Sequence, residues 1–268
     1  MCNAILTMNK TIYQIASIKI EVMGIYKDSF WYPFQITSSC EADISIEVLK
    51  KQCDLYDLEN ITLTVEENYC IRHFSEIMLA DRNWKKIRIF PIFDVSATEA
   101  FFVQAFYSQA AKQCMVEVHS SLISHQNQGI MFLGPSGIGK TTQAELWQKY
   151  RSSLIINGDI VFVQETESGF LGWGTPWHGS SPYCENTSVP LKAMVVLKQA
   201  EQNSIRELSG FEKVTEVSNS VFYPQWLENG MELCLETLDH LLTSIPVYEL
   251  RCRPDEDAVR LTEQTIFS

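Results

Sequence analysis

Residues 134–142 read GPSGIGKTT and have the complete spacing of a phosphate-binding loop: a glycine, four residues, then Gly-Lys-Thr. Glycines let the backbone curl, so that successive N–H groups point into one concavity that suits the oxygens of a di- or triphosphate. The lysine of such a loop reaches the outer phosphates, and the threonine hydroxyl can hold a magnesium ion. We therefore expect these residues to bind a nucleotide: Gly134, Ser136, Gly137, Ile138, Gly139, Lys140, Thr141 and Thr142.

The residues on either side provide the context that such a loop requires. An apolar run of strand length, GIMFLG, precedes it, and the good helix former TTQAELWQKY follows it. Strand, glycine loop and helix N-terminus suit this chemistry, because the helix dipole and its free N–H groups favour an anion. The alternative is a structural glycine turn. With these flanks, we favour nucleotide binding.

Composition limits the kind of protein. The 268 residues suit one large domain or two small ones, and 46% hydrophobic with 20% charged residues is ordinary for a soluble globular chain. A net charge of −12 argues against nucleic acid or an anionic membrane as partner. The eight cysteines contain no C-x-x-C pair, which is typical of buried thiols in a reducing compartment rather than of a zinc or redox site. With no signal-peptide layout and no apolar run of membrane-spanning length, we expect a cytoplasmic protein.

The front of the chain, from residue 11 to about 91, alternates apolar and polar residues with a period of two. Such alternation predicts strands buried on one face and mostly antiparallel pairing. The apolar positions that carry this pattern are Ile18, Ile20, Val22, Ile44, Ile46, Val48, Ile61, Leu63, Val65, Ile87 and Ile89. An aromatic-rich helix, opened by Ser96-Ala97-Thr98-Glu99 and running to about Cys114, should follow and be buried. We expect a β-rich portion at 1–95 and a nucleotide-binding portion at 96–268.

The second portion should alternate strands and helices. VEVHSSLISH and GIMFLG predict two strands joined by a turn at 126–129, and LIINGD and IVFVQET predict a further strand pair. PLKAMVVLKQ at 190–199 is typical of a buried strand. A late strand, VYELRCRP, and a closing helix at 255–267 complete the chain.

Asp159 is the best candidate for the carboxylate that phosphoryl transfer requires for its metal. It closes an apolar strand, and a strand next to the loop strand would deliver its carboxylate beside the phosphates. The alternative is a turn aspartate in Asn157-Gly158-Asp159, because Asn-Gly is a strong hairpin signal. The loop upstream leads us to favour function.

His119 ends the strand before the one that leads into the loop. A histidine there can donate to a phosphate oxygen or take a proton from a hydroxyl, because its ordinary pKa lies near neutrality. It can equally be a core histidine whose hydrogen bonds are satisfied, and the residues leave both interpretations open.

The run GTPWHGSSP at 174–182 combines glycines with Trp177 and His178, which suits a surface that faces a substrate. A buried structural loop is the alternative. Arg251 and Arg253, near the chain end, could neutralise phosphate charge, although surface arginines are the commoner case. We group these four residues as candidates for binding the phosphate acceptor.

These segments together resemble a known family. VHSSLISHQNQGIMFLGPSGIGKTT, LIINGD, GTPWHGSSP and VYELRCRPDEDAV are similar to the HPr kinase group over roughly residues 115–268. More closely they resemble the smaller HPr-kinase-related proteins found beside peptide-modification genes, including those that phosphorylate the C-terminal serine of lasso-peptide precursors.

The resemblance implies a phosphoenolpyruvate-carboxykinase-like nucleotide fold with a mixed sheet. It also implies that Lys140 contacts phosphate, that Thr141 and Asp159 serve magnesium, that Asp159 acts as base and that His119 lies near the transferred group. Two departures matter. The family's usual Asp-Asp pair is here Gly158-Asp159, so metal and base roles fall on one carboxylate, and the E-x-R-G-x-G run linked to phosphorylase activity is absent.

We therefore expect an α/β kinase with a mixed-sheet P-loop core that uses ATP and magnesium to phosphorylate a serine-type hydroxyl on a peptide or small protein. A small-molecule kinase, for instance of free serine, is the rival within enzymes. A nucleotide-binding module that has lost catalysis is the rival outside them. The sequence leaves open whether the chain forms a homo-oligomer.

Overall fold

The computed structural model describes residues 10–24, 28–37, 41–49, 66–73, 75–91 and 95–268. Two compact units divide between Gln109 and Ala110. Helix α1 (Val95–Ala110) packs on the first unit, where the Phe102 ring meets Trp31 edge-on at 5.2 Å and Gln109 Nε2 donates to the Trp84 carbonyl at 2.9 Å. The aromatic side chains of α1 are buried, as their spread around the helix predicts.

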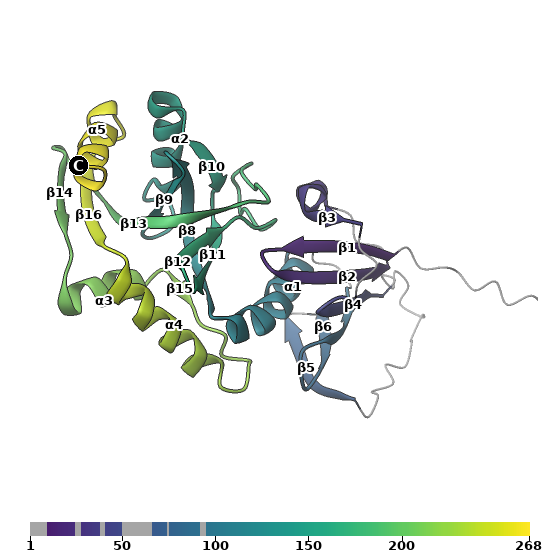
Figure 1. Ribbon diagram of the computed structural model, residues 1–268. Helices are drawn as coiled ribbons and strands as arrows, with labels where there is room; N and C mark the ends of the chain where they lie inside the picture. The colour runs from purple at the N-terminus through teal and green to yellow at the C-terminus, as the bar shows by residue number, and fades with distance from the viewer. Residues whose placement is uncertain (1–9, 25–27, 38–40, 50–65, 74, 92–94) are drawn as a thin grey trace, which may run out of the picture. The chain divides into compact units, whose positions relative to one another are not determined.

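The first unit is a seven-stranded sheet with the order β3-β1-β2-β4-β7-β6-β5 (Figure 1). Its strands and its 3-10 helix η1 are β1 (Lys10–Ile15), β2 (Ile18–Gly24), η1 (Ser29–Phe34), β3 (Gln35–Ile36), β4 (Ile44–Val48), β5 (Glu67–His73), β6 (Glu76–Asp81) and β7 (Lys86–Phe90).

The period-two pattern correctly predicts β2, β4 and β7, whose alternate apolar side chains are buried. The expected antiparallel pairing holds for β1 with β2 and for β6 with both β5 and β7. It is wrong for β4, which pairs in parallel with both β2 and β7. The strand expected at residues 61–65 lies outside the described residues.

The second unit carries the glycine loop, which we define as residues 134–139. Its elements in order are η2 (Ala111–Gln113), β8 (Met115–His125), β9 (Gln128–Leu133), α2 (Lys140–Arg151), β10 (Leu154–Asn157), β11 (Ile160–Thr166), β12 (Gly169–Trp173), β13 (Ser188–Gln199), β14 (Ser204–Glu207), α3 (Gly210–Ser218), β15 (Val221–Phe222), α4 (Gly230–Ser244), β16 (Val247–Cys252) and α5 (Glu256–Ile266) (Figure 1).

Two long strands, β8 and β13, each pair with several other strands and so join the sheet of this unit together. Strand pairings run from β8 to β9, β13, β12 and β11 and back to β8, so these five strands form a closed circuit. Strand β13 is parallel to β9 and β16, whereas β8 is antiparallel to its neighbours. The sheet is therefore mixed, as the family resemblance implies, and the described residues form a mixed α/β fold.

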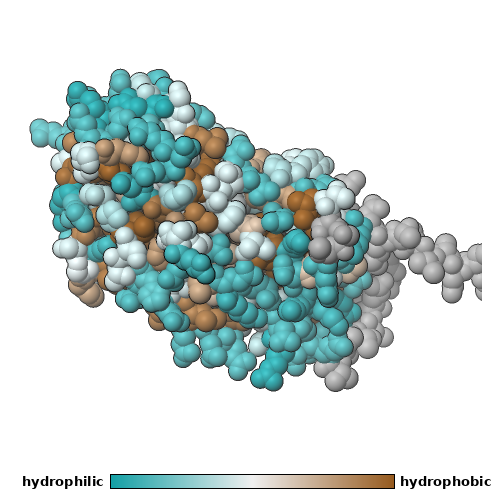
Figure 2. Space-filling view, viewed as in Figure 1, coloured by the Kyte–Doolittle hydropathy of each residue, from teal (hydrophilic) through white to brown (hydrophobic). Residues whose placement is uncertain are grey.

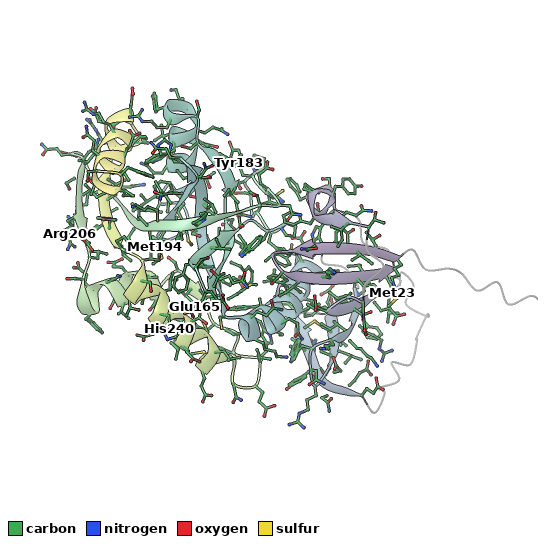
Figure 3. All side chains as sticks on the ribbon, in the orientation of Figure 1. Met23, Glu165, Tyr183, Met194, Arg206 and His240 are labelled. Atoms are coloured by element: carbon green, nitrogen blue, oxygen red, sulfur yellow. The ribbon has the colours of Figure 1, made fainter. Side chains whose placement is uncertain are left out.

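Helices cover both faces of strand β9. Ile130 and Phe132 pack into a cluster with Ala144 and Trp147 of α2 and with residues of α5. Met131, the residue between them, packs into a second cluster with residues of α4. A strand buried on both faces needs a continuous apolar run, which is what GIMFL provides. On the α4 side, the imidazole of His240 lies 3.0 Å from the Glu165 carboxylate of β11, which raises the pKa of that histidine (Figure 3).

Hydrophilic residues predominate on the face shown in Figure 2, and hydrophobic ones appear there as scattered patches. Among the described residues, no helix is long and apolar enough to span a membrane.

Candidate active site

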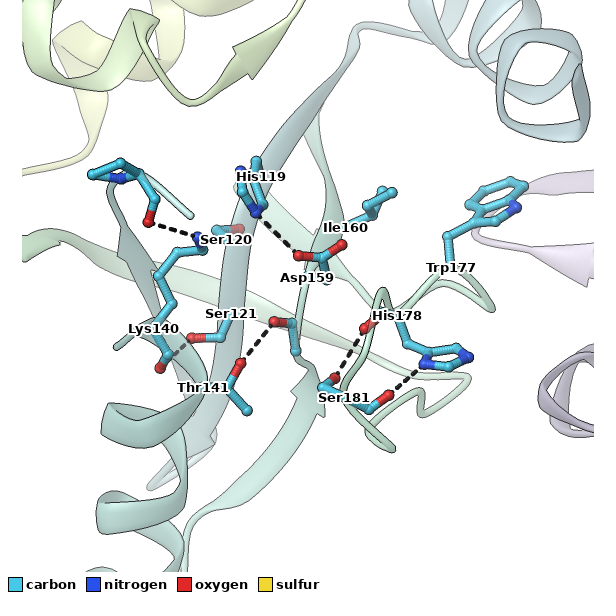
Figure 4. A network of polar contacts seen from close by, with 12 residues as sticks. His119, Ser120, Ser121, Lys140, Thr141, Asp159, Ile160, Trp177, His178 and Ser181 are labelled. Carbon is cyan, nitrogen blue, oxygen red and sulfur yellow. Dashed lines mark hydrogen bonds and ion pairs between the residues drawn. The ribbon is translucent and has the colours of Figure 1, made fainter. Parts of the chain in front are cut away.

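Strand β8 brings the candidate residues to one level of the sheet. Along one edge it pairs with β9, whose last residue, Leu133, lies opposite Ser120. Along its other edge β11 begins at Ile160, which lies opposite His119. The Ser120 amide donates to the carbonyl of Asp159 at 2.9 Å. The glycine loop and Asp159 therefore leave opposite edges of β8 at the same place (Figure 4).

The glycine loop joins β9 to α2 in the strand–loop–helix order that the sequence predicts. Its glycines 134, 137 and 139 have φ values of +135°, +78° and +113°, which residues other than glycine rarely adopt. Gly139 is the N-cap of α2, so the free N–H groups of the first helical turn face the loop. This geometry is the one that suits an anion at a helix N-terminus.

Lys140 is the first residue of α2, and its side chain folds back over the loop (Figure 4). Its Nζ donates to the carbonyl of Gly134 at 3.1 Å and lies 3.4 Å from that of Pro135. Burial lowers the pKa of this lysine, and the charge of Asp159 acts in the opposite direction. The ammonium is thus held at the mouth of the loop, where outer phosphates would meet it.

Thr141, one of the two predicted magnesium ligands, contacts the residue before the other one, Asp159. The hydroxyl of Thr141 donates to the carbonyl of Gly158 at 3.2 Å. Among the described residues, no three or more His, Cys, Asp or Glu side chains cluster as a protein-only metal site would. One hydroxyl and one carboxylate fit magnesium, because this ion usually takes one or two carboxylates and completes its shell with substrate phosphates and water.

The segment Asn157-Gly158-Asp159 is not the hairpin that Asn-Gly suggests, and β10 and β11 are not the strand pair that we expected. Both strands pair with β8, end to end along the same edge. Asn157 is fully buried, and its Oδ1 accepts from the amides of Asp159 and Ile160 at 2.8 and 3.0 Å. Its Nδ2 donates to the carbonyl of Trp177 at 3.0 Å. One asparagine therefore positions Asp159 and fixes the loop at residues 174–182, which we call the Trp177 loop.

The Trp177 loop explains why residue 158 is a glycine. A Cβ at position 158 would lie 1.9 Å from the Ser181 hydroxyl oxygen and 2.6 Å from the Ser181 Cβ. A Cβ at Gly179 would lie 2.5 Å from Oδ2 of Asp159. The loop packs directly on the Gly158-Asp159 backbone, so a second aspartate at position 158 has no room.

His119 and Asp159 contact each other. The His119 Nε2 lies 3.0 Å from the Asp159 Oδ1, and both side chains are partly accessible, at 26% and 31% exposed (Figure 4). The imidazole also stacks at a tilt on Phe222, with the ring centroids 6.2 Å apart. A carboxylate oriented by an imidazole can accept the proton of a hydroxyl.

Comparison with known proteins identifies the family. The family model described as "SynChlorMet cassette protein ScmC" matches residues 95–255, which is more than half of the chain. The chain belongs to the ScmC family. A curated relative of this ScmC-family chain, the HPr kinase/phosphorylase of Mycoplasmopsis pulmonis, is 25% identical over 215 residues.

That alignment covers 75% of this chain and 63% of the relative, so the ScmC-family chain spans less than two thirds of the relative's length. The resemblance to HPr-kinase-related proteins that we drew from the sequence is confirmed. A solved structure, the Hpr(Ser) kinase/phosphatase from Coxiella burnetii, aligns with a TM-score of 0.34 and 10% identity over 56% of this chain and 88% of its own.

The ScmC-family chain buries the tryptophan that we expected to face a substrate. The side chain of Trp177 is 4% exposed, and its ring lies 6.3 Å from that of Phe162. His178 is partly exposed and its Nδ1 is bonded to the Ser181 carbonyl, while Gly179 and Ser180 are exposed. Acceptor binding by this loop stays a prediction, now resting on its exposed tip rather than on the indole.

Arg251 and Arg253, the two arginines predicted to bind the acceptor, do not lie on the Trp177 loop of this ScmC-family chain. Arg251 on β16 pairs with Glu249 at 2.9 Å. Arg253, just after β16, pairs with Asp255 at 3.0 Å and lines a cavity beside the glycine loop. Strand β16 neighbours β13 and β14, whereas the Trp177 loop follows β12.

The sequence reasoning missed Glu117. This residue shares a face of β8 with His119, two residues on, and its side chain is only 4% exposed. Burial, reinforced by the negative charge of Asp159, raises its pKa from 4.5 to about 8. A charged residue between two valines in an apolar run, Val116-Glu117-Val118, is the signal that could have revealed it.

We expect Glu117→Gln to abolish the loss of folding stability that the wild type should show as the pH rises from 4.5 to about 8. Between pH 4.5 and about 8 the folded chain keeps this proton and the unfolded chain releases it. The wild-type free energy of unfolding therefore falls as pH rises, by up to about 1.4 kcal/mol per pH unit. Urea unfolding should find the variant similar to the wild type near pH 4.5 and more stable at pH 7.5. The exposed Glu167→Gln is the matched control, for which we expect no such difference. A variant that gains nothing between these pH values would mean that Glu117 is ionised in the folded chain.

Proposed function

We propose that this chain is a kinase that uses ATP and magnesium to phosphorylate a serine-type hydroxyl on a peptide or small protein. The observation that carries the proposal is the meeting of a glycine loop and its Lys140 with Thr141, Asp159 and His119 at one level of β8. The name of the M. pulmonis relative, a kinase/phosphorylase, supports the same reaction class. A P-loop core of the HPr kinase and phosphoenolpyruvate-carboxykinase type is part of the proposal, as is a cytoplasmic location.

The residues divide the reaction between them. The glycine loop and the N-terminus of α2 bind the phosphates, and Lys140 contacts the outer ones. Thr141 and Asp159 would hold magnesium, which when bound neutralises charge on the phosphates. The acceptor oxygen forms a bond to the γ-phosphorus while the bond from that phosphorus to the β,γ-bridging oxygen breaks, and the electron pair leaves with ADP. The proton of the hydroxyl passes to the Asp159 carboxylate, which His119 orients.

The two oxygens of Asp159 face different neighbours. Oδ1 faces His119, and Oδ2 lies beside Gly179 at the exposed tip of the Trp177 loop. An acceptor hydroxyl that approaches from this loop would meet Oδ2. The tip residues Gly179 and Ser180, with His178, are therefore the acceptor contacts that we propose.

The test is to incubate the chain with ATP, magnesium and peptides that end in serine, and to follow added phosphate by mass spectrometry. Each peptide has a matched control in which alanine replaces the serine. We expect phosphate on the serine peptides and none on the controls. Phosphate on free serine with unmodified peptides would favour a small-molecule kinase, and ATP binding without any ADP formation would favour a non-catalytic binding module.

A further inference from the structure

A cavity of about 330 Å³ opens beside the glycine loop, within the size range of small-molecule sites. Residues 137–139 form one wall, residues 197–200 at the end of β13 form another, and residues 252–254 at the end of β16 form a third. Because β9, β13 and β16 are parallel, the cavity lies at the carboxyl ends of three neighbouring strands. Ligands of α/β proteins bind preferentially at such an edge.

The walls of this cavity suit a flat, uncharged group rather than another phosphate. Leu197, Ala200 and Pro254 supply apolar surface. The two cations at its rim are engaged elsewhere: the Lys198 ammonium pairs with Glu216 at 2.9 Å, and Arg253 pairs with Asp255.

Cys252, which also lines the cavity, is a neutral thiol near pH 7, because burial raises its pKa to about 11. A nucleotide whose phosphates occupy the glycine loop carries a group with these properties, namely its base.

Gln143 supplies the polar edge of this cavity. It lies three residues after Lys140, in the first turn of α2, and is 3% exposed. Its Nε2 donates to the Cys252 Sγ at 3.2 Å. Its Oε1 is buried and accepts no hydrogen bond from any described residue. Leaving a buried acceptor without a donor is unfavourable, so this atom favours a ligand that brings one.

We propose that this cavity holds the base of the nucleotide and that Gln143 selects adenine over guanine. The inference rests on the proposed function, because it requires a nucleotide whose phosphates lie in the glycine loop. Adenine carries an amino donor at its 6-position, where guanine carries a carbonyl acceptor. Because Nε2 already donates to Cys252, Oε1 is the amide atom left to pair with a base, and it would accept from the adenine amino group and oppose the guanine oxygen.

The experiment measures the dissociation constants of ATP, GTP and inorganic tripolyphosphate for wild type, Gln143→Leu, Gln143→Met and Gln148→Leu by calorimetry. Gln148 lies on the same helix and is exposed, so Gln148→Leu is the matched control. The methionine variant keeps the length and flexibility of glutamine, which guards against misfolding of the leucine variant. Circular dichroism checks that each variant is folded.

We expect the wild type to bind ATP at least about tenfold more tightly than GTP, and either Gln143 variant to raise the ATP constant by about tenfold. The constants for GTP and tripolyphosphate, and all constants of Gln148→Leu, should stay within about twofold of the wild type. Equal wild-type affinity for ATP and GTP, or an ATP preference that survives both Gln143 variants, would overturn the inference and leave the proposed kinase standing. Weaker tripolyphosphate binding in the folded variants would also overturn it, because Gln143 would then support the loop rather than contact the base. A wild type that binds none of the three ligands would overturn the proposed function itself.

Discussion

Lys140→Ala should abolish phosphoryl transfer and weaken ATP binding by at least about tenfold. The ammonium of Lys140 lies over the glycine loop, 3.1 Å from the Gly134 carbonyl, where a phosphate oxygen can replace the carbonyl as its partner. A charge-assisted hydrogen bond of this kind contributes roughly 1.5–3 kcal/mol, which is a factor of about ten to a hundred in affinity. Alanine is a good helix residue, so α2 should still form.

The measurements are ATP affinity by calorimetry and phosphate transfer to peptide by mass spectrometry. Lys149→Ala removes an exposed lysine from the last turn of the same helix and should change neither. A folded Lys140→Ala chain with wild-type affinity and turnover would remove the glycine loop from consideration as the active site.

Asp159→Asn should lower the transfer rate by at least ~10²-fold, the usual loss when a general base is removed, while most of the ATP affinity remains. The backbone of Asp159 is held by Asn157 and Ser120, so an asparagine of nearly the same shape should leave the local structure intact. Because the loop leaves no room for a second carboxylate at position 158, no neighbour on this segment can substitute for the lost one.

Single-turnover kinetics with saturating ATP isolates this effect from binding. Asp239→Asn, an exposed carboxylate on α4, is the control and should behave as wild type. If the transfer rate of Asp159→Asn equals that of the wild type, Asp159 has a structural role only.

The periodicity and the motifs predicted most of the helices and strands, but they predicted only poorly which strands pair with each other. Alternation in Ile44, Ile46 and Val48 identifies a strand and its buried face, but both parallel and antiparallel neighbours satisfy the same burial. For this reason the parallel pairing of β4 could not be read from the residues. The same limit applies to β10 and β11, which satisfy the apolar pattern as a hairpin and equally as two segments along β8.

The candidate site was predictable where a spacing rule exists and not where tertiary packing decides. The loop spacing identified Lys140 and Thr141, and proximity to it identified Asp159. The burial of Trp177 had no such signal, because a glycine-rich loop lacks the period that separates buried from exposed side chains. The proposed role of Gln143 was equally hidden, since it depends on the contact with Cys252 of β16, which is more than a hundred residues away in the chain.

The place of β8 between the glycine loop and Asp159 sets where the chain tolerates insertions and deletions. Side chains along a strand alternate between faces, so adding or removing one residue between Ser121 and Leu122 would turn His119 and Glu117 to the opposite face while the pairing of residues 122–125 with β9 stayed in place. An extra residue at the exposed Gly179-Ser180 tip would leave the paired strands unmoved. Length variation among relatives should therefore accumulate at that tip and be absent from β8.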